Sequence, residues 1–306
     1  MSIIDKNLMQ IEEIKSKTAL NPIKSRVMPF DWDLNVYRGC THSCVYCFAR
    51  YTHEYLGHSG AKDFDQMIKV KTNIPEVLEK QINSKKFKGG VISIGGISDV
   101  YQPLEKKYKL TRKCLKVILE KGNDISICTK SPLILRDLDL LKKINQKNFC
   151  AIAFTVTTLN QKIASKIEPF APRVKDRIEA MKKIKKSGIP VGLHLMPVMP
   201  GLTDSEKDLR KLLKLAKEIK IDYIVYGNLG VRPCVRKILF PFIQKEFPEI
   251  FGLYRRFYGY VRSEKVKREL RKKREFLHKL VGEYGLHSKL KWPKKINKER
   301  QMKLKI

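Results

Sequence analysis

The sequence lacks any long uncharged apolar segment and is poor in acidic residues. No uncharged apolar run reaches the ~18 residues of a membrane-spanning helix, so we expect a soluble protein without a membrane partner. The 306 residues include only 31 Asp and Glu against 64 Lys and Arg, a formal net charge of +33. Such a charge favours a polyanionic partner such as nucleic acid, although a generally lysine-rich set of proteins in the source organism would give the same composition.

The sequence also lacks the dense, even cysteine framework of a secreted disulfide-rich domain. Three of its seven cysteines cluster within eight residues of one another, and the other four are scattered. The cluster comprises Cys40, Cys44 and Cys47, and the scattered positions are Cys114, Cys128, Cys150 and Cys234. Free thiols in this arrangement are typical of a reducing compartment, so we expect a cytoplasmic protein.

Short apolar runs rich in β-branched residues alternate with amphipathic segments of helical spacing. The runs are LNVYRG (34–39), GGVISIGG (89–96), DISICTK (124–130), CAIAFTV (150–156), PVGLHLMPV (190–198) and DYIVYGN (222–228). Alternating βα units predict an α/β fold with a parallel sheet and right-handed crossovers. Six units are too few for a closed eight-stranded barrel, so we expect a partly open (βα)6 barrel with its active site at the C-terminal ends of the strands.

The pattern divides the chain into three regions. We predict an N-terminal extension over 1–27, a core over 28–235 and a helical, strongly basic C-terminal region over 236–306. Residues 254–306 contain 19 Lys and Arg against 5 Asp and Glu, and KLKWPKKINKERQMKLKI (289–306) has the composition of a basic tail. In LYRRFYGYVR (253–262), the aromatic residues either stack on unpaired bases or form the buried face of a helix packed on the barrel.

The spacing Cys-x3-Cys-x2-Cys supplies three ligands where most metal sites need four. A structural zinc ion needs a fourth ligand, which His42 or His53 would have to provide. A four-iron cluster held by three thiolates instead leaves one iron open to an exchangeable ligand. The spacing therefore favours a cluster whose open iron binds another molecule.

The segment RGCTHSCVYCFAR (38–50) resembles the radical S-adenosylmethionine (SAM) superfamily, including the aromatic Tyr46 before the last cysteine. GGISDVYQPLE, TKSPLILRDLDLL, IEPFAPRVKDRIEAM and MPVMPGLTDSE are similar to the branch that contains spore photoproduct lyases and DNA repair photolyase-like proteins. The resemblance implies a radical SAM barrel, a [4Fe-4S] cluster on Cys40, Cys44 and Cys47, bound SAM, and a reductant such as ferredoxin or flavodoxin. It also implies reductive cleavage of SAM to a 5′-deoxyadenosyl radical.

The resemblance further assigns cofactor contacts to residues near the strand ends. Gly95 and Gly96 would approach the methionine amino group of SAM, Ser98 and Asp99 would hydrogen-bond its ammonium or carboxylate, and Lys130 and Thr155 would contact its carboxylate and ribose. Met196, Pro197 and Val198 would form an apolar floor under adenine, and the backbone of Tyr46 would contact adenine. Lys130 and Thr155 also suit ordinary roles, as a solvated lysine and a β-branched core residue.

Further polar residues near the strand ends are candidates for contacting a substrate or for supporting residues that do. They are Gln102, Glu105, Arg136, Glu168, Arg173 and Arg177. We take Asp99, Gln102, Glu105 and Cys234 as the candidate catalytic set, with Cys234 as a hydrogen-atom donor or radical relay; a lone cysteine is also a common small buried residue.

One departure limits the resemblance. The spore lyases use a donor cysteine just before a Ser-Asp pair, whereas Ile97 precedes Ser98 here, so we expect a different reaction. Three functions remain open: a radical SAM lyase or other radical enzyme acting on nucleic acid or another polyanion, a nucleic-acid-binding protein with a structural or redox-sensing cluster, and a radical enzyme acting on a small anionic metabolite.

Overall fold

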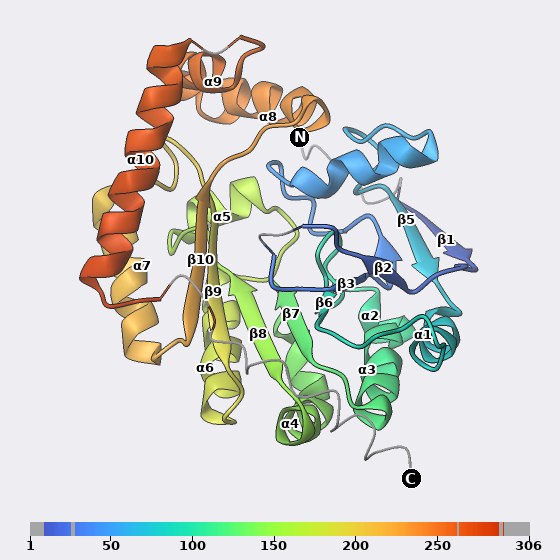
Figure 1. Cartoon of the computed structure of the whole chain (residues 1–306). Coiled ribbons are helices and arrows are strands. Elements are labelled where there is room, and N and C mark those ends of the chain that lie inside the picture. The colour runs from blue at the N-terminus through green and yellow to red at the C-terminus, as the bar shows by residue number, and fades with distance from the viewer. Residues whose placement is uncertain (1–8, 26–27, 262, 288–289, 291–306) are drawn as a thin grey trace.

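The computed structural model describes residues 9–25, 28–261, 263–287 and 290, and it centres on a curved, seven-stranded sheet (Figure 1). The strands are ordered β10-β9-β8-β7-β6-β3-β2. Their bounds are β2 Leu20–Pro22, β3 Trp32–Leu34, β6 Ile92–Ile94, β7 Ile125–Thr129, β8 Cys150–Thr155, β9 Val191–Val198 and β10 Tyr223–Asn228. All neighbours pair in parallel except β2 and β3, so six parallel strands form the partly open barrel that the six repeats predict.

A second, three-stranded sheet has the order β1-β5-β4, with β1 Gln10–Ile14, β5 Met67–Lys71 and β4 Tyr37–Arg38. The prediction of one strand over 34–39 was wrong, because the chain leaves the large sheet after Leu34 and joins the small one at Tyr37. Asn35 is buried between the two strands, where its side chain accepts a hydrogen bond from Ile97 N (3.1 Å) and donates one to Asp33 (2.5 Å). The cysteine segment therefore follows β4 rather than the first strand of the barrel.

Helices alternate with the barrel strands along the chain. They are α1 Ile74–Ile82, α2 Glu105–Tyr108, α3 Leu110–Lys121, α4 Leu138–Lys147, α5 Gln161–Ile167, α6 Val174–Lys186 and α7 Glu206–Ile219, with the 3-10 turn η3 Pro132–Asp137 before α4. Local signals fix several ends: the Ser205 hydroxyl accepts from Asp208 N at the start of α7, and Gly122 ends α3 in the left-handed conformation.

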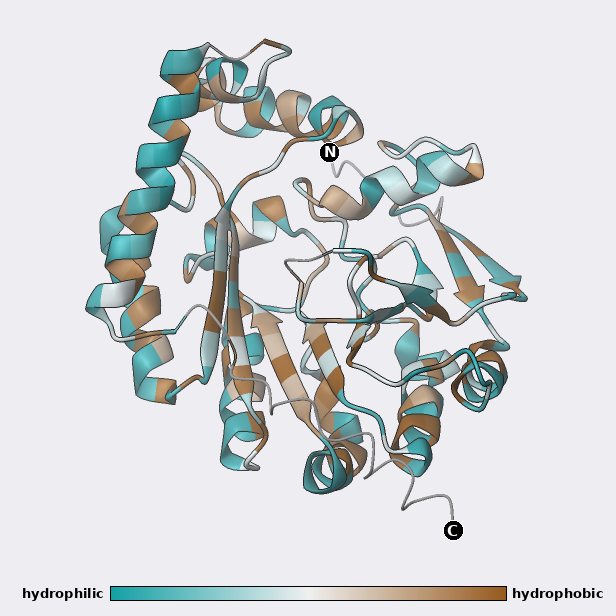
Figure 2. Ribbon diagram, viewed as in Figure 1, coloured by the Kyte–Doolittle hydropathy of each residue, from teal (hydrophilic) through white to brown (hydrophobic). Residues whose placement is uncertain are grey.

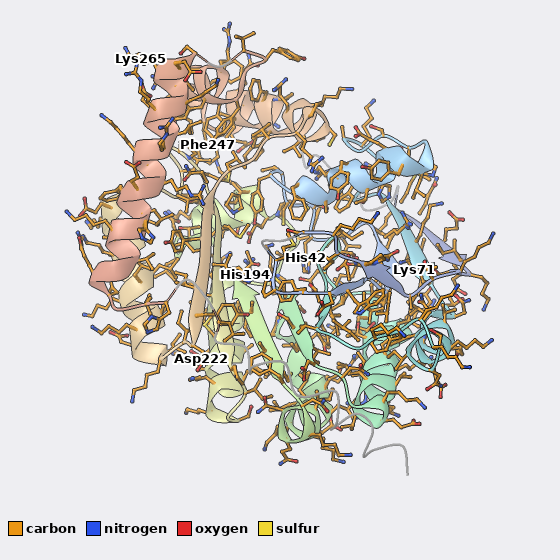
Figure 3. The ribbon with its side chains drawn as sticks, viewed as in Figure 1. His42, Lys71, His194, Asp222, Phe247 and Lys265 are labelled. Carbon is orange, nitrogen blue, oxygen red and sulfur yellow. The ribbon has the colours of Figure 1, made fainter. Side chains whose placement is uncertain are left out.

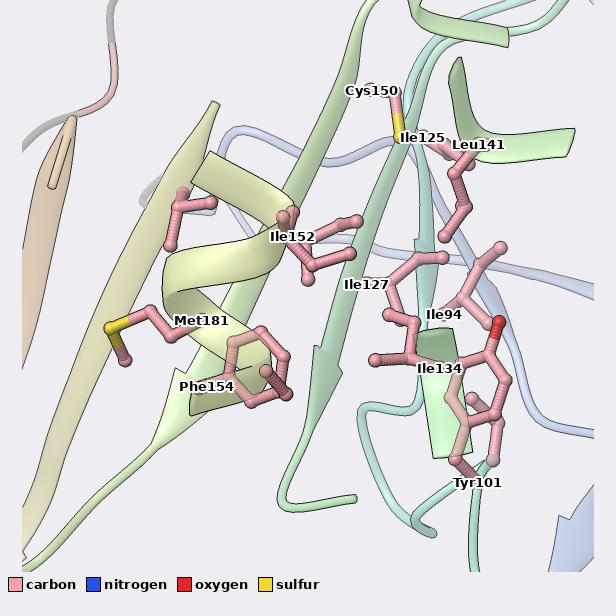
Figure 4. Close-up of a cluster of buried hydrophobic side chains, with 14 of the residues drawn as sticks. Ile94, Tyr101, Ile125, Ile127, Ile134, Leu141, Cys150, Ile152, Phe154 and Met181 are labelled. Carbon is pink, nitrogen blue, oxygen red and sulfur yellow. The ribbon is translucent and has the colours of Figure 1, made fainter. Parts of the chain in front are cut away.

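The main hydrophobic core lies between the sheet and these helices. Side chains alternate along each strand, so Ile125, Ile127, Ile152 and Phe154 pack on the helix side (Figure 4). Burying one such side chain contributes about 1.5–3 kcal/mol to folding. The residues between them in sequence face the concave side of the sheet, which is where the predicted site residues of the strands lie.

The C-terminal part is helical, with α8 Pro233–Glu246, η4 Pro248–Ile250, α9 Phe251–Tyr258 and α10 Glu264–Glu283. The long, mostly hydrophilic α10 runs beside the edge strand β10 (Figures 1 and 2). Tyr254, Phe257 and Tyr258 are buried in a second hydrophobic cluster, so these three rings follow the packing alternative, whereas Tyr260 is 91% exposed. The predicted basic tail, 289–306, lies outside the described residues except for Leu290. Among the described helices, none has the length and apolarity to cross a membrane.

Candidate active site

The three clustered cysteines lie on one loop between β4 and the 3-10 helix η2, Phe48–Leu56. Gly39 opens the loop with φ of +80°, and a Cβ there would meet the Phe64 carbonyl oxygen at 2.5 Å, so this turn requires glycine. Two backbone hydrogen bonds then anchor the loop, from Cys40 N to Phe64 O (3.2 Å) and from Val45 N to Ile167 O (3.0 Å). All three thiols are free of disulfides.

The loop buries its thiols beside cations. Burial raises the pKa of the Cys44 thiol to about 12, although the nearby Lys130 ammonium opposes this shift. Burial likewise raises the pKa of Cys47, and there Arg50 is the main opposing charge. The Arg50 guanidinium also donates to the Cys44 carbonyl (3.2 Å) and pairs with Asp65 (2.5 Å). Positive charges are therefore in place to stabilise thiolates when a metal group takes up the sulfur atoms.

The loop has the donor set and the unsatisfied groups that suit an iron-sulfur cluster. Thr41 Oγ1 and His42 Nε2 are buried without a hydrogen-bond partner in the described part of the chain. His42 Nδ1 lies 3.4 Å from Asp99, and His53 Nε2 contacts the Met67 carbonyl at 3.0 Å, so each ring already has a partner other than a thiol.

No group of three or more His, Cys, Asp or Glu side chains among the described residues is placed to hold a single ion.

The turn after β6 brings backbone close to the neighbouring strands. Gly95 has φ of +90°, and a Cβ there would meet the Cys128 carbonyl at 2.7 Å. A Cβ on Gly96 would lie 2.7 Å from the Asp33 carboxylate, a concave-face group on β3 whose pKa is raised by burial. Gly95 is thus required by its backbone conformation and close approach, whereas a Cβ on Gly96 would have to displace the Asp33 carboxylate; the cofactor role predicted for both glycines stays a prediction.

Ser98 and Gln102 connect this turn to the cysteine loop. Ser98 Oγ donates to the Gly39 carbonyl (2.6 Å), and the buried Gln102 amide donates to the same carbonyl (3.3 Å). Gln102 Oε1 also accepts from Thr41 N (3.0 Å). Both side chains therefore hold the start of the loop, and the direct SAM and substrate contacts predicted for them stay predictions.

Asp99 links the ends of β6 and β7. Its Oδ1 accepts from the Thr129 hydroxyl (2.7 Å) and from Tyr101 N (2.9 Å), and its Oδ2 accepts from Lys130 N (2.8 Å). His42 lies against the same carboxylate, and burial lowers the pKa of this imidazole although Asp99 acts to raise it. The contact between the His42 imidazole and the Asp99 carboxylate thus connects the cysteine loop to the ends of β6 and β7.

A polar cluster lies beside Cys44, formed by the buried residues Tyr46, Glu168 and Arg177 together with the half-buried Lys130. Arg177 Nη1 is 2.5 Å from Glu168 Oε2, and the Tyr46 hydroxyl donates to the other carboxylate oxygen. The Lys130 ammonium lies 5.7 Å from the centre of the Tyr46 ring. Burial acts to lower the pKa of Lys130, but the Cys44 thiol and the Glu168 carboxylate raise it by more than burial lowers it. The pKa therefore lies above its ordinary value, and the amine stays charged. Four predicted residues therefore gather next to the cysteine loop.

Glu105 and Arg136 form a separate network. The buried Glu105 carboxylate accepts from the Tyr37 hydroxyl (2.5 Å), Thr111 N (3.0 Å) and Arg136 (2.8 Å). These contacts join β4, α3 and η3, so they account for the burial of Glu105 without a substrate. The catalytic role predicted for Glu105 stays a prediction, and the predicted Arg173 lies at the surface, 73% exposed and paired with Asp176.

Cys234 lies in the first turn of α8, 2% exposed, within the second hydrophobic cluster. A Cβ on Gly60 would meet its Cβ at 3.1 Å, and burial raises the pKa of its thiol. This environment fits the alternative role given above for Cys234, that of a small buried residue. Hydrogen-atom donation by Cys234 stays a prediction.

The remaining predicted contacts lie on β8 and β9. Thr155 is buried at the end of β8, and its carbonyl accepts from Arg177 (3.2 Å). Met196 is 40% exposed and Pro197 partly buried near the end of β9. The adenine floor predicted for Met196, Pro197 and Val198 stays a prediction.

The sequence analysis missed a thiol and an imidazole in the same part of the barrel. Cys128 Sγ on β7 lies 3.1 Å from His194 Nδ1 on β9, and Figure 3 shows His194 in the middle of the molecule. Both residues carry a period-two signal. Cys128 precedes Lys130 by two positions and His194 precedes Met196 by two, so each shares a strand face with a residue already assigned to the site.

Known proteins share this sequence pattern and fold. The family model described as "Radical SAM superfamily" matches residues 34–213. An uncharacterised protein of Mycobacterium tuberculosis is 32% identical over 248 residues, covering 80% of this chain and 73% of that protein. Another uncharacterised protein, from Methanocaldococcus jannaschii, is 34% identical over 198 residues, covering 65% of this chain and 71% of that protein.

A solved spore photoproduct lyase variant with bound AdoMet and dinucleoside spore photoproduct is similar in fold, with a TM-score of 0.63 at 15% identity. The match covers 92% of this chain and 82% of that one. Together with the cysteine loop on an open parallel barrel, these similarities show that the chain belongs to the radical SAM superfamily and is an enzyme of that superfamily.

Proposed function

We propose that this enzyme binds a [4Fe-4S] cluster through Cys40, Cys44 and Cys47, cleaves SAM reductively, and removes a hydrogen atom from a polyanionic substrate, foremost nucleic acid. The carrying observation is the loop of three free thiols, two of them buried and Cys47 half-buried, with Lys130 and Arg50 beside them. The cluster and SAM, when bound, supply a one-electron reduction and a 5′-deoxyadenosyl radical.

The residues around the loop have separate tasks in this proposal. Gly95 and Gly96 leave the backbone open to the methionine part of SAM, and Lys130 offers a cation for its carboxylate. Ser98 and Gln102 hold the loop through the Gly39 carbonyl, so the thiols keep their orientation. The solved relative of similar fold contains AdoMet and a dinucleoside, which supports the same cofactor and a nucleic acid substrate.

The cluster assignment is tested on anaerobically reconstituted protein. Replacing any one of Cys40, Cys44 or Cys47 by Ala should remove the four-iron absorption and stop reductive formation of 5′-deoxyadenosine. Cys150→Ala is the matched control, because Cys150 is fully buried at the start of β8 without a metal role. A loop variant that keeps its iron and its turnover would overturn the ligand set, and wild-type protein that holds iron but never cleaves SAM would favour a structural or redox-sensing cluster.

A mostly cationic cavity supports the polyanionic substrate. It has a volume of about 570 Å³ and lies between β10 and α10, and its polar lining consists of Tyr226, Arg271, Arg274, His278 and Lys279 with one acidic residue, Glu275. Neither arginine nor Lys279 forms an ion pair within the described residues, whereas Lys267 and Lys273 of the same helix do. Unpaired cations around a cavity are available for phosphate groups, whose counterions are released on binding.

Salt dependence of binding tests this part. For a fluorescein-labelled single-stranded oligonucleotide, Arg271→Gln/Arg274→Gln should reduce the slope of log K against log salt by about 1.4, since each phosphate contact with a single strand contributes ~0.7. Lys142→Gln/Lys143→Gln on α4 removes the same charge from another exposed helix and should change the slope much less. Equal losses in both double variants, or no measurable binding by the wild type, would favour a small anionic metabolite as the substrate.

The electron donor is expected to approach near the cysteine loop. A second cavity of about 510 Å³ is lined by Ser43 and Val45 of the loop, by Lys62, and by Lys166, which pairs with Glu246 (3.1 Å). Ferredoxins and flavodoxins carry acidic surfaces, which complement Lys62 beside the loop. Chemical cross-linking of Lys62 to reduced flavodoxin, lost in Lys62→Gln, tests this approach.

A further inference from the structure

Three neighbouring strands place reactive side chains together on the concave face of the sheet. Cys128 comes from β7, Thr155 from β8 and His194 from β9. The Cys128 sulfur lies 3.1 Å from His194 Nδ1 and 3.6 Å from the Thr155 hydroxyl. Since Ile127, Phe154 and Leu193 pack in the core on the helix side, alternation fixes these three side chains on the opposite face.

Cys128 differs from the other thiols outside the loop. Cys114 and Cys150 are almost fully buried, and burial raises the pKa of each thiol. Cys128 is half-buried; burial acts to raise the pKa of its thiol, but His194 and the Thr155 hydroxyl lower it below the ordinary value. A cysteine that only fills space in the core needs no imidazole partner. Such a role for Cys128 would therefore not explain its contact with His194.

The surroundings hold the imidazole with one nitrogen toward the sulfur. The Tyr223 ring packs edge-on against His194, with 6.4 Å between ring centres. Tyr223 fits there only because residue 192 is glycine, since a Cβ on Gly192 would lie 2.2 Å from the ring. His194 Nε2 has no protein hydrogen bond among the described residues and is not buried, so this nitrogen is available to a bound molecule or water.

We propose that Cys128 and His194 form an acid–base pair that exchanges a proton with the substrate inside the barrel. The thiol proton passes to His194 Nδ1, which leaves a thiolate and an imidazolium. The thiolate then accepts a proton from an acidic N–H or O–H of the substrate, and the imidazolium releases its proton to water or to a substrate oxygen. The pair returns to thiol and neutral imidazole with no net change in electrons.

The charged and titratable neighbours of the pair are few. Lys130 directly follows β7, two residues after Cys128, and its charge favours the thiolate. Tyr223 of β10 faces the pair with a phenol whose pKa is raised by burial, so it stays neutral. Thr155 supplies an uncharged hydroxyl. Lys130 and Thr155 are also predicted to contact SAM, which places the pair near the reacting atoms; in this respect the inference rests on the proposed function.

Alkylation by iodoacetamide, followed at each cysteine by mass spectrometry, tests the pair. At pH 6.5 an ordinary thiol is only about 1% ionised. In reconstituted wild type, Cys128 should react at least ~5-fold faster than in His194→Gln, the gain in thiolate being partly offset by its lower nucleophilicity. Cys150 in the same samples is the internal control and should not respond. An equal rate in the two proteins, or no reaction at Cys128, would overturn the pair.

Addition of SAM separates this inference from the proposed function. When calorimetry shows that SAM binds, it should slow alkylation of Cys128, because the cofactor covers the same strand ends. Bound SAM without protection would place Cys128 away from the reacting atoms and exclude the acid–base role. Absence of SAM binding would instead refute the proposed function, while the alkylation of Cys128 in His194→Gln would still report on the pair.

Discussion

Replacing Glu168 by Gln should destabilise the protein far more than its single lost charge suggests. Arg177 is 2% exposed, and among the described residues its only carboxylate partner is Glu168, at 2.5 Å. Its other contacts are the carbonyls of Pro172 (2.8 Å) and Thr155 (3.2 Å), which orient the guanidinium without neutralising it. Removing one partner of a buried ion pair costs about 3–5 kcal/mol, because the remaining charge stays desolvated and unpaired.

A double-mutant cycle isolates this effect. Arg177→Met alone leaves Glu168 unpaired, whereas Glu168→Gln/Arg177→Met removes both charges and should recover part of the loss. We expect a coupling free energy of at least ~2 kcal/mol, measured by urea unfolding of the apo protein followed by circular dichroism. The control cycle uses the exposed pair Arg173 and Asp176, where solvent screening leaves a much smaller coupling. Additive changes at Glu168 and Arg177 would refute the buried-pair reasoning.

The pH dependence gives a second check on the same pair. Burial acts to raise the pKa of Glu168, but Arg177 and Lys130 lower it below its ordinary value. A carboxyl with a lowered folded-state pKa stabilises the fold fully above its unfolded pKa of about 4.3 and loses this contribution as pH falls through the folded pKa. The difference in free energy of unfolding between wild type and Glu168→Gln should therefore shrink in acid; a difference that grows there would reverse the sign of the argument.

Two glycine substitutions test close approaches. Gly192→Ala places a Cβ 2.2 Å from the Tyr223 ring and should lower the free energy of unfolding by ~1–3 kcal/mol, whereas Gly227→Ala on the next strand meets open space and should change it little. Gly96→Val brings a branched side chain against the Asp33 carboxylate and should weaken SAM binding measured by calorimetry while leaving iron content unchanged. Unchanged affinity would remove Gly96 from the cofactor site.

The barrel could be predicted from the sequence because its signal is local. The runs at 124–130 and 150–156 correspond closely to β7 and β8, since continuous apolarity marks strands buried on both faces. The small sheet could not be found this way. β4 has two residues and β1 five, and both pair with β5, whose Met67 lies 57 residues beyond its partner Gln10. Pairing over such separations depends on tertiary packing rather than on the composition of either segment.

The site could be placed at the strand ends, but the direction of each side chain could not. Ser98 and Gln102 follow β6 as a substrate-binding loop would, yet their side chains turn to the Gly39 carbonyl. Glu105 lies a few residues farther along and binds Arg136 of η3. Position after a strand indicates nearness to the site, whereas hydrogen-bond partners decide whether a residue faces the ligand or supports the loop.

Strand alternation carries more information about the site than position at a strand end does. Packing of Ile127 and Leu193 against the helices forces Cys128 and His194 to the concave face, so the sequences ISICTK and GLHLMP already predict the orientation of both side chains. The sequence does not predict the distance between them, because β8 lies between β7 and β9 and the strands are offset. Cys128 pairs with Ala153, while His194 pairs with Thr155. That two-residue offset moves His194 toward the strand ends, so the 3.1 Å contact between its Nδ1 and the Cys128 sulfur depends on the register of β7, β8 and β9 as well as on the two residues themselves.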